Sequence, residues 1–370
     1  MSLLRPHLRA TTDTPAPVFR EDNMAIRSRR LRDQYEQLLR PKRYGEKIKL
    51  RYEKLRRLVV LKGIPSESVN ESTTHQTHCS LRGRVWKMLL GVQSVDAQEY
   101  VYQVQRTTSV EMSEKIEKDI ERTFKNNVTF HNRVTDDQLR RVLNAYVNSM
   151  DVGEEDGEER RGTGHATERK EQSGKRRQRR NSKKESSGGL YVQGMNVLAA
   201  PFLYVMNELD AYSCLRRLLN HHCPQYITKD LHGAQHAAQL LQEILKHIDP
   251  ILENHIHTMY NGDWGSVTSL PTLLSMSADK PCETMDELLK LWDVLFALGV
   301  HMNVIFVVAH MILMRNVLLK GNHQLLQSTL CVHKNVLPMK ANLIISLSLH
   351  IVQKLPNDVY DRLECHPYNK

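Results

Sequence analysis

Apolar residues recur every three or four positions along most of this chain, which is the spacing of one buried face of an α-helix. The pattern is clearest over residues 236–247. Residues 285–298 are apolar nearly all round, which is typical of a helix at the centre of a core. No segment alternates apolar and polar residues well enough to predict a strand, and no repeat is visible at the usual periods. The pattern predicts an all-α protein.

Turn and capping residues divide this pattern into separate helices. Pro41 and Gly45 interrupt a basic helical segment, and Gly91 closes the helix that starts at Leu81. Thr135 is a favourable cap for the helix that follows it. We expect helices at 25–61 with that interruption, 81–90, 97–102, 135–150, 197–205, 236–247, from Pro250 onward, 285–298, 303–319, 343–355 and 358–363.

The stretch from Ile116 to Phe124 carries the first candidate chemistry. Its apolar residues follow one another at four-residue spacing and therefore share one helical stripe: Ile116, Ile120 and Phe124. Asp119 and Arg122 are three apart, which makes them neighbours on the same predicted helix. Such a pair is most often a plain surface ion pair. It is also an arrangement in which a carboxylate holds a guanidinium ready for an anionic ligand, and the stretch alone leaves both interpretations open.

Two parts of the chain are too polar to form a core. Residues 1–24 contain prolines and little apolar periodicity, which predicts a disordered tail. Residues 151–189 open with six acids in nine positions, and eleven Lys or Arg follow within 160–184. Such a segment cannot bury enough apolar surface to offset the entropy lost on ordering, which predicts a disordered insertion. Its basic half would suit nuclear import or nucleic acid, but no aromatic residues are interleaved for base stacking.

The composition fits an intracellular helical protein. The 370 residues are 40% hydrophobic and 6% aromatic, and the formal net charge is +10. That charge suits an acidic partner, although much of it lies in 25–61 and 160–184. The six cysteines form no Cys-x-x-Cys pair, so reduced thiols fit better than disulfides. No signal peptide is visible, and the most apolar run, 304–319, is interrupted and too short for a clean membrane span.

Two clusters contain potential zinc ligands. His75, His78 and Cys79 lie close together, as do residues 221–223. Neither cluster has a matching second ligand pair at a spacing typical of zinc sites, which argues against a metal centre.

Two other segments place polar side chains beside apolar helices. Arg82 and Trp86 are one turn apart, so the guanidinium could lie along the indole ring, although packing alone is the simpler interpretation. Gln193 comes just before the buried helix at 197–205. Its amide is either held in place for a ligand or merely caps that helix.

Five segments in order resemble the TBC-domain GTPase-activating proteins. The three signature motifs of that family correspond to Arg82-x-x-x-Trp86, Ile116-x-x-Asp119-x-x-Arg122 and Tyr191-x-Gln193. The two further similar segments are Lys62-Gly63-Ile64-Pro65 and the Trp-Asp helix around Trp292-Asp293. Five matches in order over about 240 residues make coincidence improbable. Within the family, the C-terminal half looks most similar to the fungal spindle-position-checkpoint branch.

The resemblance implies a two-lobed TBC fold with a groove between the lobes. The chain departs from the family pattern in two polar insertions, 66–80 and 151–189, which can loop out because the cost of loop closure grows slowly with length. The second insertion directly precedes Tyr191 and therefore bears on access to the site. The expected organisation is a tail at 1–24, a basic helical extension at 25–61, a TBC domain at 58–355 interrupted at 151–189, and a C-terminal tail at 356–370.

The resemblance also implies the chemistry. Small GTPases hydrolyse GTP slowly, and an arginine supplied in trans accelerates the reaction by ~10³–10⁵ because it neutralises charge on the transferring phosphoryl group. Members of the family supply both an arginine finger and a glutamine finger, which correspond here to Arg122 and Gln193. The expected supporting residues are Asp119, Tyr191, Arg82 and Trp86.

The expected partner is a small GTPase of the Rab-like class, which brings its own GTP and Mg²⁺. The chain is therefore expected to need no cofactor or metal, and to act as a GTPase activator without an independent active site. A co-GAP or scaffold subunit is a further candidate partner, whereas nucleic acid is not expected. The alternative function is a non-catalytic scaffold for a small GTPase or a spindle-pole partner. A cytoplasmic location is expected, with recruitment to membranes, a spindle pole or a basal body left open, and trafficking and cell-cycle roles both fit.

Overall fold

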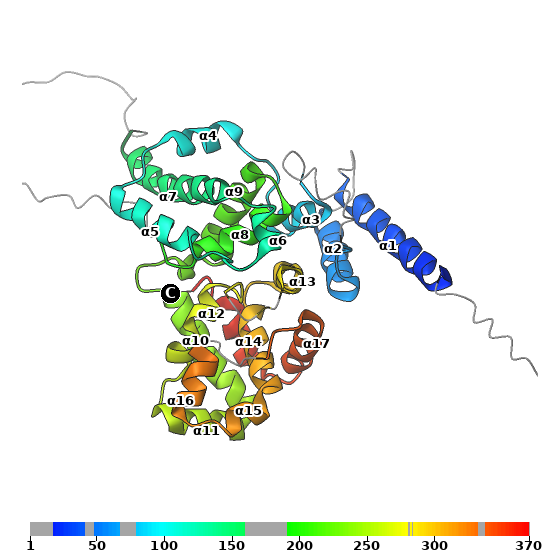
Figure 1. Ribbon diagram of the computed structural model, residues 1–370, viewed down its shortest axis with the longest axis vertical. Coiled ribbons are helices and arrows are strands. Elements are labelled where there is room, and N and C mark those ends of the chain that lie inside the picture. The colour runs from blue at the N-terminus through cyan, green and yellow to red at the C-terminus, as the bar shows by residue number, and fades with distance from the viewer. Residues whose placement is uncertain are drawn as a thin grey trace, which may run out of the picture.

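A computed structural model describes residues 18–40, 48–66, 79–159, 191–279, 282, 284–331 and 337–369 of the chain. The helices of these segments form two lobes (Figure 1). Within the described segments there is no β-strand, only an isolated bridge between Cys282 and Met339. The predicted all-α, two-lobed fold is therefore confirmed.

The N-terminal lobe carries the segments that match the three motifs. Its helices are α3 (Leu81–Leu90), α4 (Ala97–Gln105), α5 (Val110–Ile120), α6 (Val128–His131), α7 (Asp136–Glu159), α8 (Met195–Val205) and α9 (Glu208–Arg217). A π-helical turn, Leu218–His222, and a 3₁₀ turn, Pro224–Tyr226, follow α9. Every residue of α8 is buried, which makes this helix the centre of the lobe.

The C-terminal lobe is the compact group of helices in the lower half of Figure 1. Pro250 occupies the first turn of its second helix, as predicted, and Asn261 ends that helix in the left-handed conformation with φ 54°. The helices are α10 (His232–Ile248), α11 (Pro250–Tyr260), α12 (Gly265–Leu274), α13 (Met285–Leu298), α14 (Met302–Leu313), α15 (Arg315–Leu319), α16 (His323–Leu326), α17 (Ala341–Val352) and α18 (Asn357–Cys365).

An aromatic cluster joins the two lobes at α13. Trp86 of α3 packs against Phe296 of α13 with ring centroids 5.0 Å apart, and against Phe202 of α8 at 5.8 Å. Trp292 of α13 completes the cluster, 5.8 Å from Trp86. Such pairs contribute roughly 0.5–1.5 kcal/mol each beyond the burial of their area. The prediction that 285–298 lies at the centre of the core is confirmed.

The basic extension consists of α1 (Val18–Leu39) and α2 (Ile48–Lys62). The Tyr52 hydroxyl of α2 donates to the carbonyl oxygen of Leu89 at 2.9 Å, and Arg56 donates to the carbonyl oxygen of Ala297. These contacts fasten α2 to the core, while the first part of α1 projects away from it (Figure 1). The α1 helix begins at Val18, within the segment predicted as a tail, and residues 1–17 lie outside the described residues.

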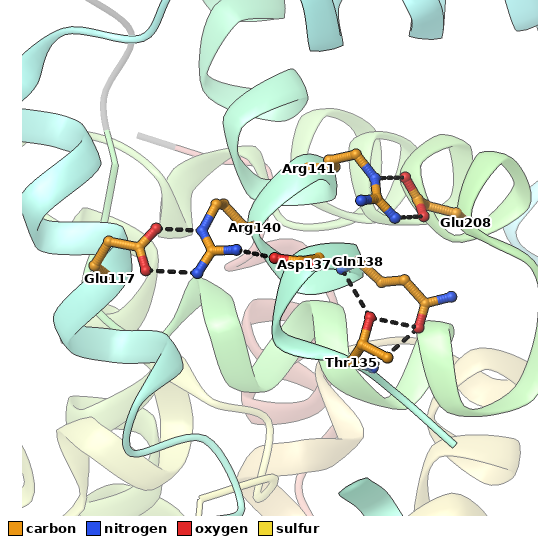
Figure 2. A network of polar contacts seen from close by, with 7 residues as sticks. All are labelled: Glu117, Thr135, Asp137, Gln138, Arg140, Arg141 and Glu208. Carbon is orange, nitrogen blue, oxygen red and sulfur yellow. Dashed lines mark hydrogen bonds and ion pairs between the residues drawn. The ribbon is translucent and has the colours of Figure 1, made fainter. Parts of the chain in front are cut away.

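A polar network fastens α5 to α7 (Figure 2). Arg140 of α7 binds Glu117 of α5 through Nε at 2.5 Å and Nη2 at 2.8 Å, which lowers the pKa of the Glu117 carboxyl. At the start of α7 the backbone amide of Gln138 donates to Thr135 Oγ1 at 3.2 Å. In return, the side-chain oxygen Oε1 of Gln138 accepts from the backbone amide of Thr135 at 3.0 Å. This capping box confirms Thr135 as the predicted cap. It also fixes the helix that positions α5.

Two of the differences between the predicted helix boundaries and the structure have a local explanation. The sequence predicts that α7 ends at Met150, but the helix continues to Glu159, through glutamates that are favourable helix formers. The remaining part of the predicted insertion, 160–189, lies outside the described residues. The helix predicted at 303–319 is divided at Met314 into α14 and α15. There Arg315 turns toward Asp249, which it binds through Nε at 2.5 Å.

The C-terminal segment is packed rather than free. The sequence assigns 356–370 to a tail, although it also predicts a short helix there, and the structure places α18 in it. Val359, Leu363 and His366 are buried. His366 Nε2 lies 2.9 Å from the Tyr226 hydroxyl, and burial lowers the pKa of His366 to about 4. The apolar residues of this segment give it a place in the C-terminal lobe.

The remaining predictions concern membrane spans, cysteine thiols and metal ligands among the described residues. None of their helices is both long and apolar enough to cross a bilayer. The six cysteines are all free thiols. No group of three or more His, Cys, Asp or Glu in these segments is arranged to hold a metal ion. His75 and His78 of the first candidate zinc cluster lie outside the described residues, as does the basic part of the predicted insertion.

Candidate functional site

Arg122 lies in a tight turn just after α5, and not on the helix that the sequence predicts. The α5 helix ends at Ile120, and the Arg122 amide bonds back three residues, to the carbonyl oxygen of Asp119, at 3.3 Å. The Thr123 hydroxyl donates to that same oxygen at 2.7 Å, which in a continued helix would accept from the Thr123 amide. Phe124 follows with φ 46° and therefore leaves the predicted helical stripe.

The carboxylate of Asp119 holds Arg122 in place. Asp119 is buried, and its Oδ1 accepts from Arg122 Nη2. Its Oδ2 accepts from the Tyr191 hydroxyl at 2.8 Å and from the Gly194 amide at 3.4 Å. The Arg122 side chain is 54% exposed, so the pair adds little to stability. The ion pair instead orients the Arg122 side chain, because it binds the exposed guanidinium to a carboxylate that is itself held in place.

Tyr191 connects the segment before α8 to the arginine turn. Its ring is buried, and burial together with the nearby Asp119 carboxylate raises the pKa of its hydroxyl far above the ordinary value. The phenol therefore keeps its proton at neutral pH and donates to Asp119. This contact is consistent with the expectation that Asp119 and Tyr191 support the site, which stays a prediction.

Asn196 makes a second connection that sequence reasoning missed. This buried residue of α8 donates through Nδ2 to the Asp119 carbonyl oxygen at 3.1 Å and to Thr123 Oγ1 at 2.8 Å. The available signal was an amide in the first turn of an otherwise apolar helix, because a buried amide requires partners. The turn that carries Arg122 is thus bonded to α8 as well as to Tyr191.

Replacing Asn196 with alanine is expected to lower the free energy of unfolding by about 1–3 kcal/mol, since it leaves a buried hydroxyl and carbonyl with one donor fewer. Urea denaturation monitored by circular dichroism measures this loss. Asn254, which is exposed on α11, supplies a matched control, and its alanine variant should unfold like the wild type. Equal stability of the two variants would show that the Asn196 amide does not join the two segments.

Gln193 lies in the turn that precedes α8, and its side chain is exposed. The N-cap of α8 is Gly194, whose φ is 101°, and no side chain caps the helix there. The interpretation in which Gln193 merely caps the helix is therefore wrong. The left-handed conformation of Gly194 is one that a glycine adopts without strain, and it lets the chain enter α8 directly after Gln193.

Arg122 and Gln193 line one cavity of about 590 Å³. The N-terminal lobe contributes these two residues and the start of α8, and the C-terminal lobe contributes Leu231 and residues of α12. This is the groove between the lobes that the resemblance implied. An exposed guanidinium and an amide that both donates and accepts can recognise an anionic oxygen and a neighbouring water.

Arg82 and Trp86 do not line this cavity. Both donate to Asp293 of α13: Trp86 Nε1 to Oδ1 at 2.7 Å, and Arg82 Nε to both carboxylate oxygens at 3.1 and 3.2 Å. This shared acceptor was anticipated neither by the alternative in which the guanidinium lies along the indole nor by packing alone. A buried carboxylate requires such partners, which is why two donors converge on one acid.

Asp293 was recognised only as part of a motif, and its role as acceptor was missed. Burial raises its pKa to about 6, while Arg82 and Trp86 oppose that shift because both stabilise the ionised carboxylate. The signal in the sequence was an acid within a helix that is apolar nearly all round. Arg82 and Trp86 thus join α3 to α13 and support the packing of the lobes, at a distance from the cavity.

Comparison with known proteins gives matches over most of the chain. The model of the Rab-GTPase-TBC domain family matches residues 79–153 and 179–319. A Dictyostelium discoideum protein named for the mitotic check point protein BUB2 is 35% identical over 317 residues, which cover 85% of this chain and 74% of that protein. The cell division control protein 16 of Schizosaccharomyces pombe is 31% identical over 318 residues, covering 85% of this chain and 88% of that protein.

Among solved structures, the Ypt/Rab-GAP domain of Gyp1p is similar with a TM-score of 0.61. The match covers 88% of this chain and 98% of that domain, at 16% sequence identity. At this identity the likeness shows that the two proteins share a fold.

Proposed function

Because the chain belongs to the Rab-GTPase-TBC domain family and is a GTPase-activating protein, we propose that it supplies Arg122 and Gln193 in trans to a Rab-like small GTPase. The relatives also confirm the resemblance to the fungal mitotic checkpoint branch. The observation that carries the proposal is a shared site: Arg122 and Gln193 line one cavity, and Asp119 and Tyr191 bond the segments that bear them.

Arg122 is the proposed arginine finger. Asp119 binds its Nη2, and the exposed remainder of the guanidinium is available to a phosphate that enters the cavity. A guanidinium presents its donors as a planar fork that matches phosphate oxygens. Charge builds on these oxygens as the γ-phosphoryl group is transferred, so a positioned arginine stabilises the transition state more than the bound substrate.

Gln193 is the proposed glutamine finger. Its amide donates and accepts at once, which allows it to hold the attacking water and contact the phosphate at the same time. The partner GTPase brings the GTP and Mg²⁺ that take part in the reaction. Asp119 and Tyr191 position the two fingers relative to each other, while Arg82 and Trp86 act only through the packing of α3 on α13.

The partner is proposed to belong to cell-cycle control, because relatives of this chain are named as mitotic check point and cell division control proteins. A co-GAP or scaffold subunit, and recruitment to a spindle pole, basal body or membrane, remain parts of this proposal. The exposed arginines of α1, among them Arg27, Arg29 and Arg30, are available for such contacts.

A panel of purified Rab-like GTPases loaded with GTP tests the proposal. Single-turnover hydrolysis should be accelerated by orders of magnitude for at least one of them when the wild-type chain is added. The double variant Arg122→Ala, Gln193→Ala is the matched control and should leave the intrinsic rate unchanged. If the wild type binds a GTPase but accelerates hydrolysis no more than the double variant does, the non-catalytic scaffold is the correct function.

A further inference from the structure

The net positive charge of this chain is concentrated in the basic extension. Residues 25–61 contain thirteen Lys or Arg and four Asp or Glu, a net charge of +9, while the whole chain carries +10. The remaining residues, taken together, are therefore close to neutral. Arg27, Arg29 and Arg30 are exposed on α1, whose first part projects away from the lobes (Figure 1). Such a concentration of positive charge attracts an anionic surface.

The outward face of α2 combines leucines with basic residues. Leu50, Lys54, Arg57 and Leu61 are four, three and four positions apart, so they form one stripe along the helix. We call these four residues the α2 stripe. All four are exposed, Leu50 by 46% and Leu61 by 63%. A helix face that only meets water ordinarily carries polar residues, so the two leucines call for a partner.

Contacts on the opposite side of α2 keep this stripe turned outward. Leu55 and Val59 are buried on that side, and the Tyr52 hydroxyl donates to the Leu89 carbonyl oxygen at 2.9 Å. The surroundings of the stripe are basic as well, because α2 contains six Lys or Arg and a single acid, Glu53. The leucines are therefore fixed on a predominantly positive surface.

Two kinds of anionic partner differ in what they require of this surface. An acidic protein segment pairs with the cations and leaves the exposed leucines without a function. An anionic bilayer uses both, because its headgroups attract Lys and Arg while leucine side chains enter the boundary between headgroups and acyl chains. Leucines and cations on one stripe therefore favour the bilayer.

We propose that the α2 stripe and the exposed arginines of α1 bind the surface of a bilayer that contains anionic lipids. The α2 helix would lie in the plane of the interface, and salt would weaken the binding because it screens the charges. The proposal goes beyond GTPase activation and rests only on the membrane recruitment that the proposed function includes. The probes for it are therefore lipid vesicles, without a GTPase.

Co-sedimentation of the full chain with vesicles tests the role of charge. The wild type should bind vesicles of equal parts phosphatidylserine and phosphatidylcholine, and should bind pure phosphatidylcholine at least about 10-fold more weakly. The variant Arg29→Glu, Arg30→Glu should lose about 30-fold or more on the mixed vesicles, because each cation near such a surface contributes about fivefold. Lys229→Glu, Lys246→Glu changes the net charge equally at exposed positions of the C-terminal half, and should bind as the wild type does.

Glutamine in place of the leucines tests the apolar contact at constant charge. Leu50→Gln, Leu61→Gln should bind the mixed vesicles about 10-fold more weakly than the wild type, because two apolar side chains no longer enter the interface. Ile251→Gln is the matched control, since Ile251 is 65% exposed on α11, and its variant should bind normally. Circular dichroism checks that every variant keeps the helical fold.

The outcomes separate a membrane surface from its alternatives. Equal binding to both kinds of vesicle, or wild-type binding by either the double glutamate or the double glutamine variant of the extension, would overturn the proposal. Tight binding to polyglutamate without binding to vesicles would assign the surface to an acidic protein instead. Hydrolysis by the GTPase panel in solution should be stimulated equally by all these variants. Vesicle binding by a wild type that stimulates no GTPase would support the membrane surface and overturn only the proposed function.

Discussion

Arg122→Ala is expected to lower GTP hydrolysis stimulated by this chain by ~10³–10⁵, which is the contribution of an arginine supplied in trans. The guanidinium is exposed in the cavity, and its ion pair with Asp119 contributes little stability, so its removal should not unfold the lobe. Single-turnover hydrolysis measures the rate, and thermal unfolding checks the fold. The loss should appear in the rate at saturating GTPase and leave binding nearly unchanged.

Two further variants separate the finger from a mere surface charge. Arg362 is also an exposed arginine bound to a carboxylate, that of Glu243, and it lies on α18 away from the cavity. Arg362→Ala should therefore leave the stimulated rate unchanged. Arg122→Lys keeps the charge but loses the planar fork, so we expect it to remain far below the wild type. A lysine variant with wild-type activity would contradict bidentate phosphate recognition.

The sequence predicted those elements whose evidence is local. The predicted bounds of α13, 285–298, agree with the structure, because continuous apolarity, the capping Thr284 and the terminal Gly299 coincide there. Gly91 closes α3 with φ 75°, as a glycine after the last apolar position suggests. The all-α class follows from many such segments.

Features that depend on distant contacts were not predictable from local patterns. The end of α5 at Ile120 depends on Thr123 and on Asn196, which is 73 residues further along the chain than Thr123. In the same way, Arg82 and Trp86 are one turn apart, but their common acceptor, Asp293, is 211 residues from Arg82. Local spacing shows which residues are neighbours on a helix. It does not show which remote side chain forms hydrogen bonds with their polar groups.

These remote bonds explain how two fingers from separate segments form one site. Asp119 accepts from Arg122 of its own turn and from Tyr191, 72 residues away. Asn196 makes the corresponding connection in the other direction, from α8 back to the Asp119 carbonyl oxygen. The ends of the intervening segment are thus held together whatever its length. This arrangement accommodates the polar residues inserted between the two motifs, because they lie between fixed points.

Gln193→Ala should lower the stimulated rate by about 10²–10³, the usual cost of removing one preorganised group that acts on the transition state. Gln193 is exposed, and Gly194 rather than Gln193 caps α8, so the loss cannot be attributed to helix stability. Single-turnover hydrolysis at saturating GTPase measures it. Gln324, exposed on α16, is the matched control, and Gln324→Ala should be as active as the wild type.

Gln193→Glu separates amide chemistry from size. The glutamate is isosteric, but it loses the amide donor and places a negative charge next to the γ-phosphate, so its rate should be no higher than that of Gln193→Ala. Because Arg122 and Gln193 act on one transition state, the double variant should lose less than the product of the single losses. A Gln193→Glu variant that keeps the wild-type rate would show that the attacking water is oriented by the GTPase itself, and Arg122 would then be the only finger.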